Sequence, residues 1–206
     1  MNRPDVMRGA DNGAAGLWVL RHGESTANVD GVICSAPGAR ALTEVGLTDR
    51  GREQARAAAR SARTENGLGP DTVVVSSDYA RALQTAQEFA AGIGAAAPRI
   101  DQRLRERFFG IHDEGPASAY ELVWTADRTR RDPGGEVEPV RAVADRVRSA
   151  VEDVDALAAT GVDVVLVAHG DILQIALALG AGMDPHDHRE VPHLGNAEMR
   201  HLGEGR

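Results

Sequence analysis

Short apolar runs alternate with amphipathic segments along most of the chain. Residues 17–20, 72–75 and 162–168 form runs whose length and Val/Leu content are typical of buried strands. The segments between and after these runs predict helices over 48–63, 79–91, 139–159 and 172–179. Continuous apolar strands separated by helices indicate a parallel sheet covered on both faces. The pattern therefore predicts the α/β class, with a single three-layer α/β/α domain around a mostly parallel sheet.

The residues around these elements predict where helices begin and which segments lie outside the central elements. Thr48 predicts the N-cap of the first helix, and Ser77 or Asp78 predicts that of the second. The segment 114–135 predicts a mixture of helix and loop, and residues 197–202 predict a short edge strand. Residues 1–15 are polar and rich in Gly and Ala, so we expect a flexible N-terminal leader before a domain over 16–206.

Composition and charge exclude several classes of function. The 206 residues are 42% hydrophobic and carry a net charge of −8, which argues against a nucleic-acid partner. No apolar stretch approaches the roughly 20 residues that cross a bilayer, so no membrane partner is expected. The single cysteine excludes an internal disulfide framework and fits a reducing compartment. We therefore expect a cytoplasmic protein that is a monomer or a homodimer.

Polar clusters follow three of the predicted strands. They are Arg21-His22 after the first, Ser76-Ser77 with Arg81 one helical turn later, and His169-Gly170 after the last. In open α/β sheets the ligand site lies beyond the carboxyl ends of the strands, so the fold should bring these clusters together. Arginine matches phosphate oxygens bidentately, and a neutral imidazole is a competent nucleophile. Two histidines and two arginines gathered in an otherwise acidic protein therefore indicate a phosphate site.

Further motifs accompany these clusters along the chain. In order, they are Leu20-Arg21-His22-Gly23-Glu24-Ser25 with Asn28, Leu47-Thr48 with Gly51, Gln54 and Ala55, Ser76-Ser77-Asp78 with Arg81, Leu104 with Glu106 and Gly110, Gly134-Gly135-Glu136, and Ala168-His169-Gly170. Together and in this order, from Trp18 to about Leu202, they resemble the motifs of the histidine phosphatase superfamily. The resemblance implies a phosphoglycerate-mutase-like fold.

The resemblance also implies a role for each matching residue. His22 would attack a phosphoryl group and carry it as a phosphohistidine. Glu106 would protonate the leaving alkoxide and then take a proton from the water that cleaves the phosphoenzyme. The other matching residues would bind the phosphoryl group or the substrate, and the two arginines and the histidine among them would also stabilise transition-state charge: Arg21, Ser25, Asn28, Arg81, His169 and Gly170. No metal and no cofactor is implied, because fixed positive charge takes the place of a metal.

These features favour a phosphomonoesterase that acts on a small phosphorylated metabolite. A phosphoglycerate-type mutase is the main alternative within the resemblance. The segment between Gly110 and Gly134 is short, however, and should leave the phosphoenzyme open to water. A non-catalytic module that binds phosphorylated ligands is a further alternative, and the presence of nucleophile, arginines and acid argues against it.

Two residues have a competing interpretation. Cys34 and Arg40 fit the C-x5-R spacing of cysteine-dependent phosphatases, which makes Cys34 a minor alternative nucleophile. Pro37 argues against it, because it removes an amide donor that a phosphate-binding loop would use. Glu106 lies in a string of alternating charges, so a surface ion pair is the alternative to a catalytic acid.

Residues outside the motifs are open to a second role. His186, His188 and His193 fit no standard zinc spacing, so metal binding is not expected there. Trp124 is expected to pack or to form part of a lid. A solvated face is favoured for three arginines of the middle region, with contact to a second anionic group of the substrate as the alternative: Arg128, Arg130 and Arg131.

Overall fold

A five-stranded sheet forms the centre of the protein. The computed structural model describes residues 15–203, so most of the predicted leader (1–14) lies outside the described residues. The strands lie in the order β3-β2-β4-β1-β5. Neighbouring strands are parallel except at one edge, where β5 pairs antiparallel with β1, and this confirms a mostly parallel sheet. In chain order the strands are β1 (Leu17–Arg21), β2 (Val73–Ser76), β3 (Arg99–Ile100), β4 (Val164–Ala168) and β5 (Met199–His201).

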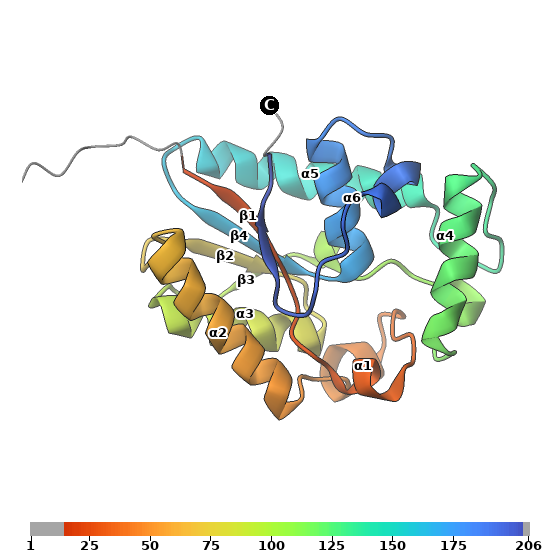
Figure 1. Ribbon diagram of the computed structural model, residues 1–206, viewed down its shortest axis with the longest axis horizontal. Coiled ribbons are helices and arrows are strands. Elements are labelled where there is room, and N and C mark those ends of the chain that lie inside the picture. Colours follow the sequence, from red (N-terminus) through yellow and green to blue (C-terminus); the bar gives the residue numbers. More distant parts are fainter. Residues whose placement is uncertain (1–14, 204–206) are drawn as a thin grey trace, which may run out of the picture.

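Helices cover both faces of the sheet, which confirms the predicted three layers (Figure 1). α2 (Asp49–Glu65) and α3 (Ala80–Ile93) lie on one face, and α5 (Val140–Ala158) and α6 (Gly170–Gly180) lie on the other. Within residues 15–203, no helix combines the length and the apolar character needed to cross a membrane.

The two faces of β4 separate the two cores. Val164 and Leu166 pack with α5 and α6, whereas Val165 and Val167 pack with α2 and α3. All four side chains are buried, as expected for a strand that is covered on both faces. Small residues replace the scarce aromatics between the helices, and Ala59 of α2 is fully buried there. Packing on both faces therefore fixes the position of β4, and with it the position of His169 and Gly170, which follow the strand.

The helix caps follow the prediction in one case and differ in the other. Thr48 caps α2, and its Oγ1 accepts a hydrogen bond from the Gly51 N–H at 3.0 Å. The prediction of Ser77 or Asp78 for the next helix is wrong, because the N-cap of α3 is Tyr79. Tyr79 still has extended backbone (φ −67°, ψ 134°), so the helix begins later, and its N–H donates to Ser77 Oγ at 3.3 Å.

Between β3 and α5 the chain leaves the sheet. Short 3₁₀ turns lead into α4 (Tyr120–Arg128), which confirms the predicted mixture of helix and loop. α4 stands apart from the central layers in Figure 1. A buried ion pair ties it to the body, because the guanidinium of Arg107 donates to both carboxylate oxygens of Asp127 at 2.6 and 3.0 Å.

Candidate active site

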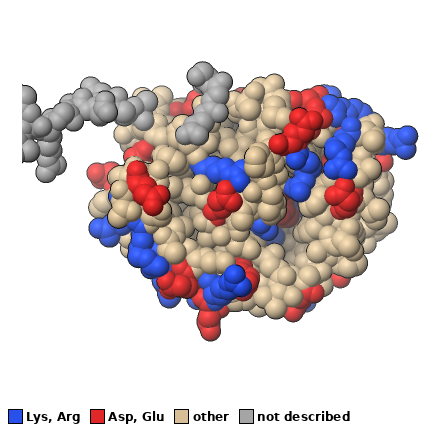
Figure 2. Space-filling model, in the orientation of Figure 1, with Lys and Arg blue, Asp and Glu red and all other residues tan. Residues whose placement is uncertain are grey.

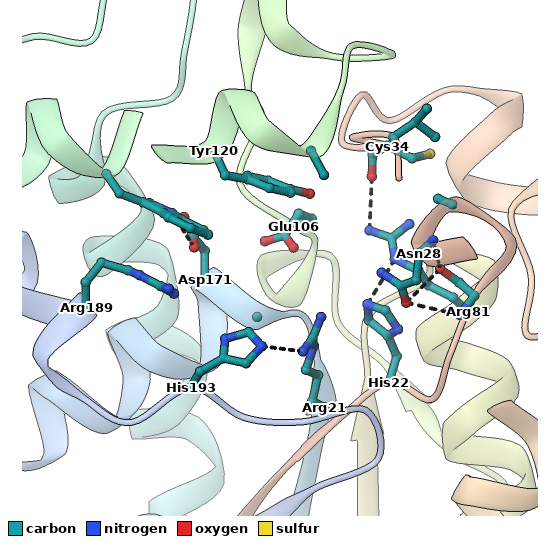
Figure 3. Close-up of a pocket in the computed structure, with 16 residues that line it drawn as sticks. Arg21, His22, Asn28, Cys34, Arg81, Glu106, Tyr120, Asp171, Arg189 and His193 are labelled. Carbon is teal, nitrogen blue, oxygen red and sulfur yellow. Dashed lines mark hydrogen bonds between the residues drawn. The ribbon is translucent and has the colours of Figure 1, made fainter. Parts of the chain in front are cut away.

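A cavity of about 250 Å³ lies beyond the carboxyl ends of β1, β2 and β4. In Figure 2 a hollow on this face is bordered by blue arginine surface, and Figure 3 shows the side chains around it. The sheet brings the predicted polar clusters to this one place. All predicted site residues except His169 line the cavity: Arg21, His22, Ser25, Asn28, Arg81, Glu106 and Gly170.

The contacts of the His22 ring fix its tautomer. Nδ1 lies 2.7 Å from the carbonyl oxygen of Gly23, which can only accept a hydrogen bond. Nε2 lies 3.3 Å from Nε of Arg81, which can only donate. The proton therefore sits on Nδ1, and the lone pair of Nε2 faces the Arg81 guanidinium. This is the form in which an imidazole can attack an electrophile.

A tight backbone approach sets the position of His22. The loop after His22 touches the first turn of α2 so closely that a Cβ added to Gly23 would lie 2.4 Å from the Gly51 carbonyl oxygen. A Cβ added to Gly51 would lie 2.0 Å from the Glu24 carbonyl oxygen. Only glycine fits at both positions. The turn of His22, Gly23 and Glu24 thus packs directly against Gly51 of α2.

Two arginines reach the cavity, one from a helix and one from a strand. Arg81 extends from the first turn of α3, where its Nη2 donates to the Cys34 carbonyl oxygen at 3.0 Å. Arg21 ends β1, and its Nη1 donates to the Leu194 carbonyl oxygen at 2.6 Å and contacts His193 Nε2 at 2.8 Å. Both guanidinium groups are held by neutral partners, so their positive charge remains available to an anion.

Burial and positive charge keep His22 neutral. Burial, followed by the charges of Arg81 and Arg21, holds the pKa of His22 well below its ordinary value. A pKa below the working pH leaves the ring unprotonated, because protonation would place a third cation beside the two arginines. The electrostatics therefore agree with the tautomer that the hydrogen bonds define.

Glu106 is buried in the cavity wall and is not a surface ion pair. Its Oε1 accepts a hydrogen bond from the backbone N–H of Arg107 at 3.0 Å. Burial, followed by the nearby charge of Asp171, raises the pKa of Glu106 to about 7. A carboxyl group with this pKa can carry a proton at neutral pH and can also release it. That is the property required of a group that acts as acid and then as base.

Ser25 and Asn28 form the capping box of the short helix α1 (Thr26–Asp30). The Asn28 backbone N–H donates to Ser25 Oγ at 3.3 Å, and the Ser25 N–H donates to Asn28 Oδ1 at 3.1 Å. Asn196 Nδ2 also donates to Asn28 Oδ1 at 3.2 Å. The box fixes the Asn28 side chain at the cavity rim, while its contact with a ligand stays a prediction.

His169 lies next to the cavity rather than on its wall. Its ring is fully buried, with its centroid 5.3 Å from that of His22, and Nε2 lies 3.0 Å from Ser77 Oγ. Burial lowers the pKa of His169, and the charge of Arg81 lowers it further. The structure therefore brings His169 close to His22, and its contact with phosphoryl oxygens stays a prediction.

The cavity wall also contains residues that the motifs do not include. They come from α4, from the start of α6, from the 3₁₀ segment η5 (Pro185–Glu190) and from the loop that follows it: Tyr120, Trp124, Asp171, Arg189 and His193. Trp124 packs as expected: its ring stacks on that of Tyr120 with an interplanar angle of 7°, and its Nε1 donates to Asp171 Oδ1 at 2.9 Å. The motifs did not include Asp171, although its place directly after Gly170 at the end of β4 could have indicated it. Arg189 had no such signal, because it reaches the cavity through the packing of η5 against α4 and α6.

Cys34 lines the cavity but lacks the surroundings of a nucleophile. Burial raises the pKa of its thiol, which disfavours the reactive thiolate. Arg40, the other half of the C-x5-R spacing, forms an exposed ion pair with Glu114 at 2.7 Å. Cys34 and Arg40 therefore do not form the phosphate-binding loop of a cysteine-dependent phosphatase.

The remaining candidates lie elsewhere. Arg128 and Arg130 form exposed ion pairs with acidic side chains, and together with Arg131 they do not line the cavity. His186 contacts Asp184 Oδ1 at 2.6 Å. Within residues 15–203, no three His, Cys, Asp or Glu side chains are grouped so that they could hold a metal ion.

Comparison with known proteins agrees with this geometry. The model of the histidine phosphatase superfamily (branch 1) matches residues 17–205. The chain belongs to the histidine phosphatase superfamily. It is 30% identical over 168 residues to phosphoglycerate mutase-like protein 4 of Arabidopsis thaliana, a match that covers 78% of this chain and 68% of the relative.

Solved structures of histidine phosphatase fold resemble the chain over most of its length. A mycobacterial glucosyl-3-phosphoglycerate phosphatase in complex with VO3 is 28% identical, with a TM-score of 0.73 and coverage of 90% of this chain and 91% of that one. The alpha-ribazole phosphatase from Shigella flexneri shares the fold at 24% identity, with a TM-score of 0.66 and coverage of 89% and 87%. Superfamily membership and the phosphatase neighbours support a hydrolase.

Proposed function

We propose that this histidine phosphatase is a phosphomonoesterase that acts on a small phosphorylated metabolite through a phosphohistidine at His22. The observation that carries the proposal is the unprotonated Nε2 of His22, which faces the Arg81 guanidinium in a cavity that also holds Arg21 and the raised-pKa carboxyl of Glu106. Nucleophile, positive charge and acid thus surround one volume of about 250 Å³, a size suited to a small ligand.

The reaction would proceed in two steps, formation of the phosphoenzyme and its hydrolysis. In the first, the lone pair of His22 Nε2 attacks phosphorus, the ester P–O bond breaks, and Glu106 gives its proton to the leaving alkoxide. In the second, Glu106 takes a proton from a water molecule whose oxygen attacks phosphorus, and the P–N bond breaks to release inorganic phosphate. Arg21 and Arg81 stabilise the charge on the phosphoryl oxygens in both steps.

Positive charge for this chemistry comes from the protein itself. Arg21 and Arg81 approach the same volume, and their hydrogen bonds to carbonyl oxygens leave their charge uncompensated. Guanidinium groups stabilise an in-line phosphoryl transition state as metal ions do elsewhere. We therefore propose a metal-independent reaction, in which chelation by EDTA leaves the rate of phosphate release unchanged.

A screen of phosphorylated metabolites tests the proposal and its rivals together. Release of inorganic phosphate supports the phosphatase, and isomerisation of 3-phosphoglycerate with little release supports a mutase instead. Tight binding of phosphorylated ligands with no turnover of any phosphomonoester would identify a binding module. The screen also identifies the substrate, because the leaving group with the highest kcat/KM is the one that the cavity fits best.

The pH dependence of the reaction should respond to Asp171. Its charge helps to raise the pKa of Glu106, so Asp171→Asn should lower that pKa. Activity requires protonated Glu106 and is lost as the pH rises through its pKa, so the basic limb of kcat/KM against pH should move to lower pH. At pH 7.5 we expect a loss of roughly two- to five-fold.

The matched control for this prediction is Glu121→Gln. Glu121 is an exposed acid that pairs with Arg128, so its removal should leave the basic limb unchanged. Asparagine at position 171 can still accept the hydrogen bond from Trp124 Nε1, so packing is retained. A basic limb that stays at the wild-type pH in Asp171→Asn would show that Asp171 does not set the pKa of Glu106.

A further inference from the structure

The chain around Glu106 forms neither a helix nor a strand. Residues 105–108 lie between two short 3₁₀ turns, η2 (Gln102–Leu104) and η3 (Gly110–His112). Backbone polar groups in such a segment lack the partners that a helix or a sheet provides, so they need side chains or water instead. The position of Glu106 in the cavity wall therefore depends on contacts from other parts of the chain.

Arg146 of α5 contacts this part of the chain with its whole guanidinium group. Its Nη1 donates to the carbonyl oxygens of Arg103 and Arg105 at 2.6 and 2.8 Å. Its Nη2 donates to the carbonyl oxygen of Glu106 at 3.4 Å. Nε and Nη2 also donate to the two carboxylate oxygens of Glu138, each at 2.8 Å. All five N–H groups of the guanidinium are thus used, and its planar fork fixes three carbonyl groups relative to one carboxylate.

Glu138 contacts the chain just after Glu106. Its Oε2 accepts a hydrogen bond from the Phe108 N–H at 3.2 Å, and its backbone carbonyl oxygen accepts one from Arg107 Nε at 2.8 Å. The Glu138 N–H in turn donates to the Phe108 carbonyl oxygen at 2.8 Å. The Arg146–Glu138 pair therefore contacts the chain on both sides of Glu106.

The arginines next to Glu106 in the sequence are paired, whereas Glu106 is not. Arg105 donates to both carboxylate oxygens of Asp78 at 2.8 and 2.6 Å, and Arg107 pairs in the same way with Asp127. Within residues 15–203, no arginine or histidine nitrogen lies within 4.0 Å of the Glu106 carboxylate. The alternating charges thus anchor the segment and leave the Glu106 carboxyl available to a substrate.

Arg146 and Glu138 do not line the cavity. Neither contacts a ligand held there, so an effect on the reaction would have to pass through the segment that they hold. General acid catalysis needs the acid within hydrogen-bond reach of the leaving oxygen, and a displacement of about 1 Å can cost about 100-fold in rate. Contacts that fix residues 105–108 therefore matter for the chemistry as well as for folding.

We propose that Arg146 is a positioning residue for the reaction: paired with Glu138, it holds the segment so that the Glu106 carboxyl reaches the leaving oxygen of the substrate. The inference rests on the proposed phosphatase function and extends it to a residue outside the cavity. Lysine at position 146 should fail to replace arginine, because one ammonium group has three donors and no planar fork. Lysine keeps the positive charge, which also acts on His169, so this variant isolates the hydrogen bonds.

Arg146→Lys is compared with the wild-type protein in single-turnover measurements on two substrates. One is the alkyl phosphate that the wild-type protein hydrolyses fastest in the metabolite screen, and the other is p-nitrophenyl phosphate, whose nitrophenolate leaves without a proton. At saturating substrate, formation of the phosphoenzyme should slow by about 10- to 100-fold for the alkyl phosphate and by less than about three-fold for the aryl phosphate. The substrate concentration that gives half the maximal rate should stay within about two-fold of the wild-type value.

The double variant with Glu106→Gln tests whether Arg146 acts through the acid. In that background Arg146→Lys should slow the alkyl phosphate by less than about two-fold further, because the acid is already lost. Equal slowing in both backgrounds, equal slowing of both substrates, or no slowing at all would overturn the inference. A Glu106→Gln variant as fast as the wild-type protein on the alkyl phosphate would instead refute the acid role in the proposed function.

Arg148→Lys is the matched control. Arg148 lies on the same helix, is exposed and pairs with Asp145 at 2.9 Å, so its replacement should leave both rates unchanged. Glu138→Gln is a second variant, which keeps the size of the side chain but removes the charge that pairs with Arg146. It should slow the alkyl phosphate alone, by a smaller factor. If thermal unfolding shows that Arg146→Lys does not fold, a folded Glu138→Gln protein with wild-type rates on the alkyl phosphate would overturn the inference.

Discussion

Replacement of His22 by alanine should lower kcat for phosphate release by about 10⁴-fold or more and should abolish covalent labelling by substrate. The imidazole is buried and neutral, and the lone pair of its Nε2 faces the Arg81 guanidinium in the cavity. Without it, water would have to attack the substrate directly. Steady-state phosphate release and retention of radiolabelled phosphate on the protein measure the two effects.

Cys34→Ser is the control for this variant, because Cys34 lines the same cavity. Burial raises the pKa of its thiol, so its loss should leave labelling intact and change kcat by less than about three-fold. The opposite pattern, in which labelling survives His22→Ala and disappears in Cys34→Ser, would transfer the nucleophile to the cysteine.

Glu106→Gln should lower kcat by about 10²- to 10⁴-fold for alkyl phosphates. Glutamine keeps the size of the side chain and its hydrogen bond from Arg107 but cannot give a proton to the leaving alkoxide. An alkoxide is a poor leaving group, so the loss of the acid should slow formation of the phosphoenzyme itself. Single-turnover measurements on an alkyl phosphate report that step.

An aryl phosphate separates the two roles of Glu106. The nitrophenolate of p-nitrophenyl phosphate departs without a proton, so Glu106→Gln should still give a rapid burst of about one equivalent of nitrophenol. The following turnover should be slow, because the water that cleaves the phosphoenzyme has lost its base. Equal slowing of the burst for aryl and alkyl substrates would contradict the assignment of Glu106 as the acid.

The sequence predicted the fold and the residues around His22 that line the cavity, because both depend on local patterns. The apolar run 162–168 indicated a buried strand, and β4 is that strand. Arg21 is the last residue of such a strand and His22 follows it, so the topology alone brings them to the carboxyl end of the sheet. Arg81 one turn into α3 reaches the same place for the same reason.

The position of Arg189 could not be predicted in this way. Arg189 reaches the cavity through the packing of η5 against α4 and α6, and Trp124 of α4 contacts both Asp171 and Arg189. The buried Arg107–Asp127 pair, which joins residues twenty positions apart, connects α4 to the body of the protein. The burial of Glu106 could not be predicted either, because the alternating charges around it in the sequence are typical of an exposed surface.

The site of phosphoryl attachment tests the central claim most directly. The protein is mixed with labelled substrate, quenched in alkali to preserve phosphoramidates, and digested, and the modified residue and ring nitrogen are identified by mass spectrometry and phosphorus NMR. We predict phosphate on Nε2 of His22, because Nδ1 is bound to the Gly23 carbonyl oxygen. An acid-stable label, a label on any other residue, or attachment through Nδ1 would contradict the account.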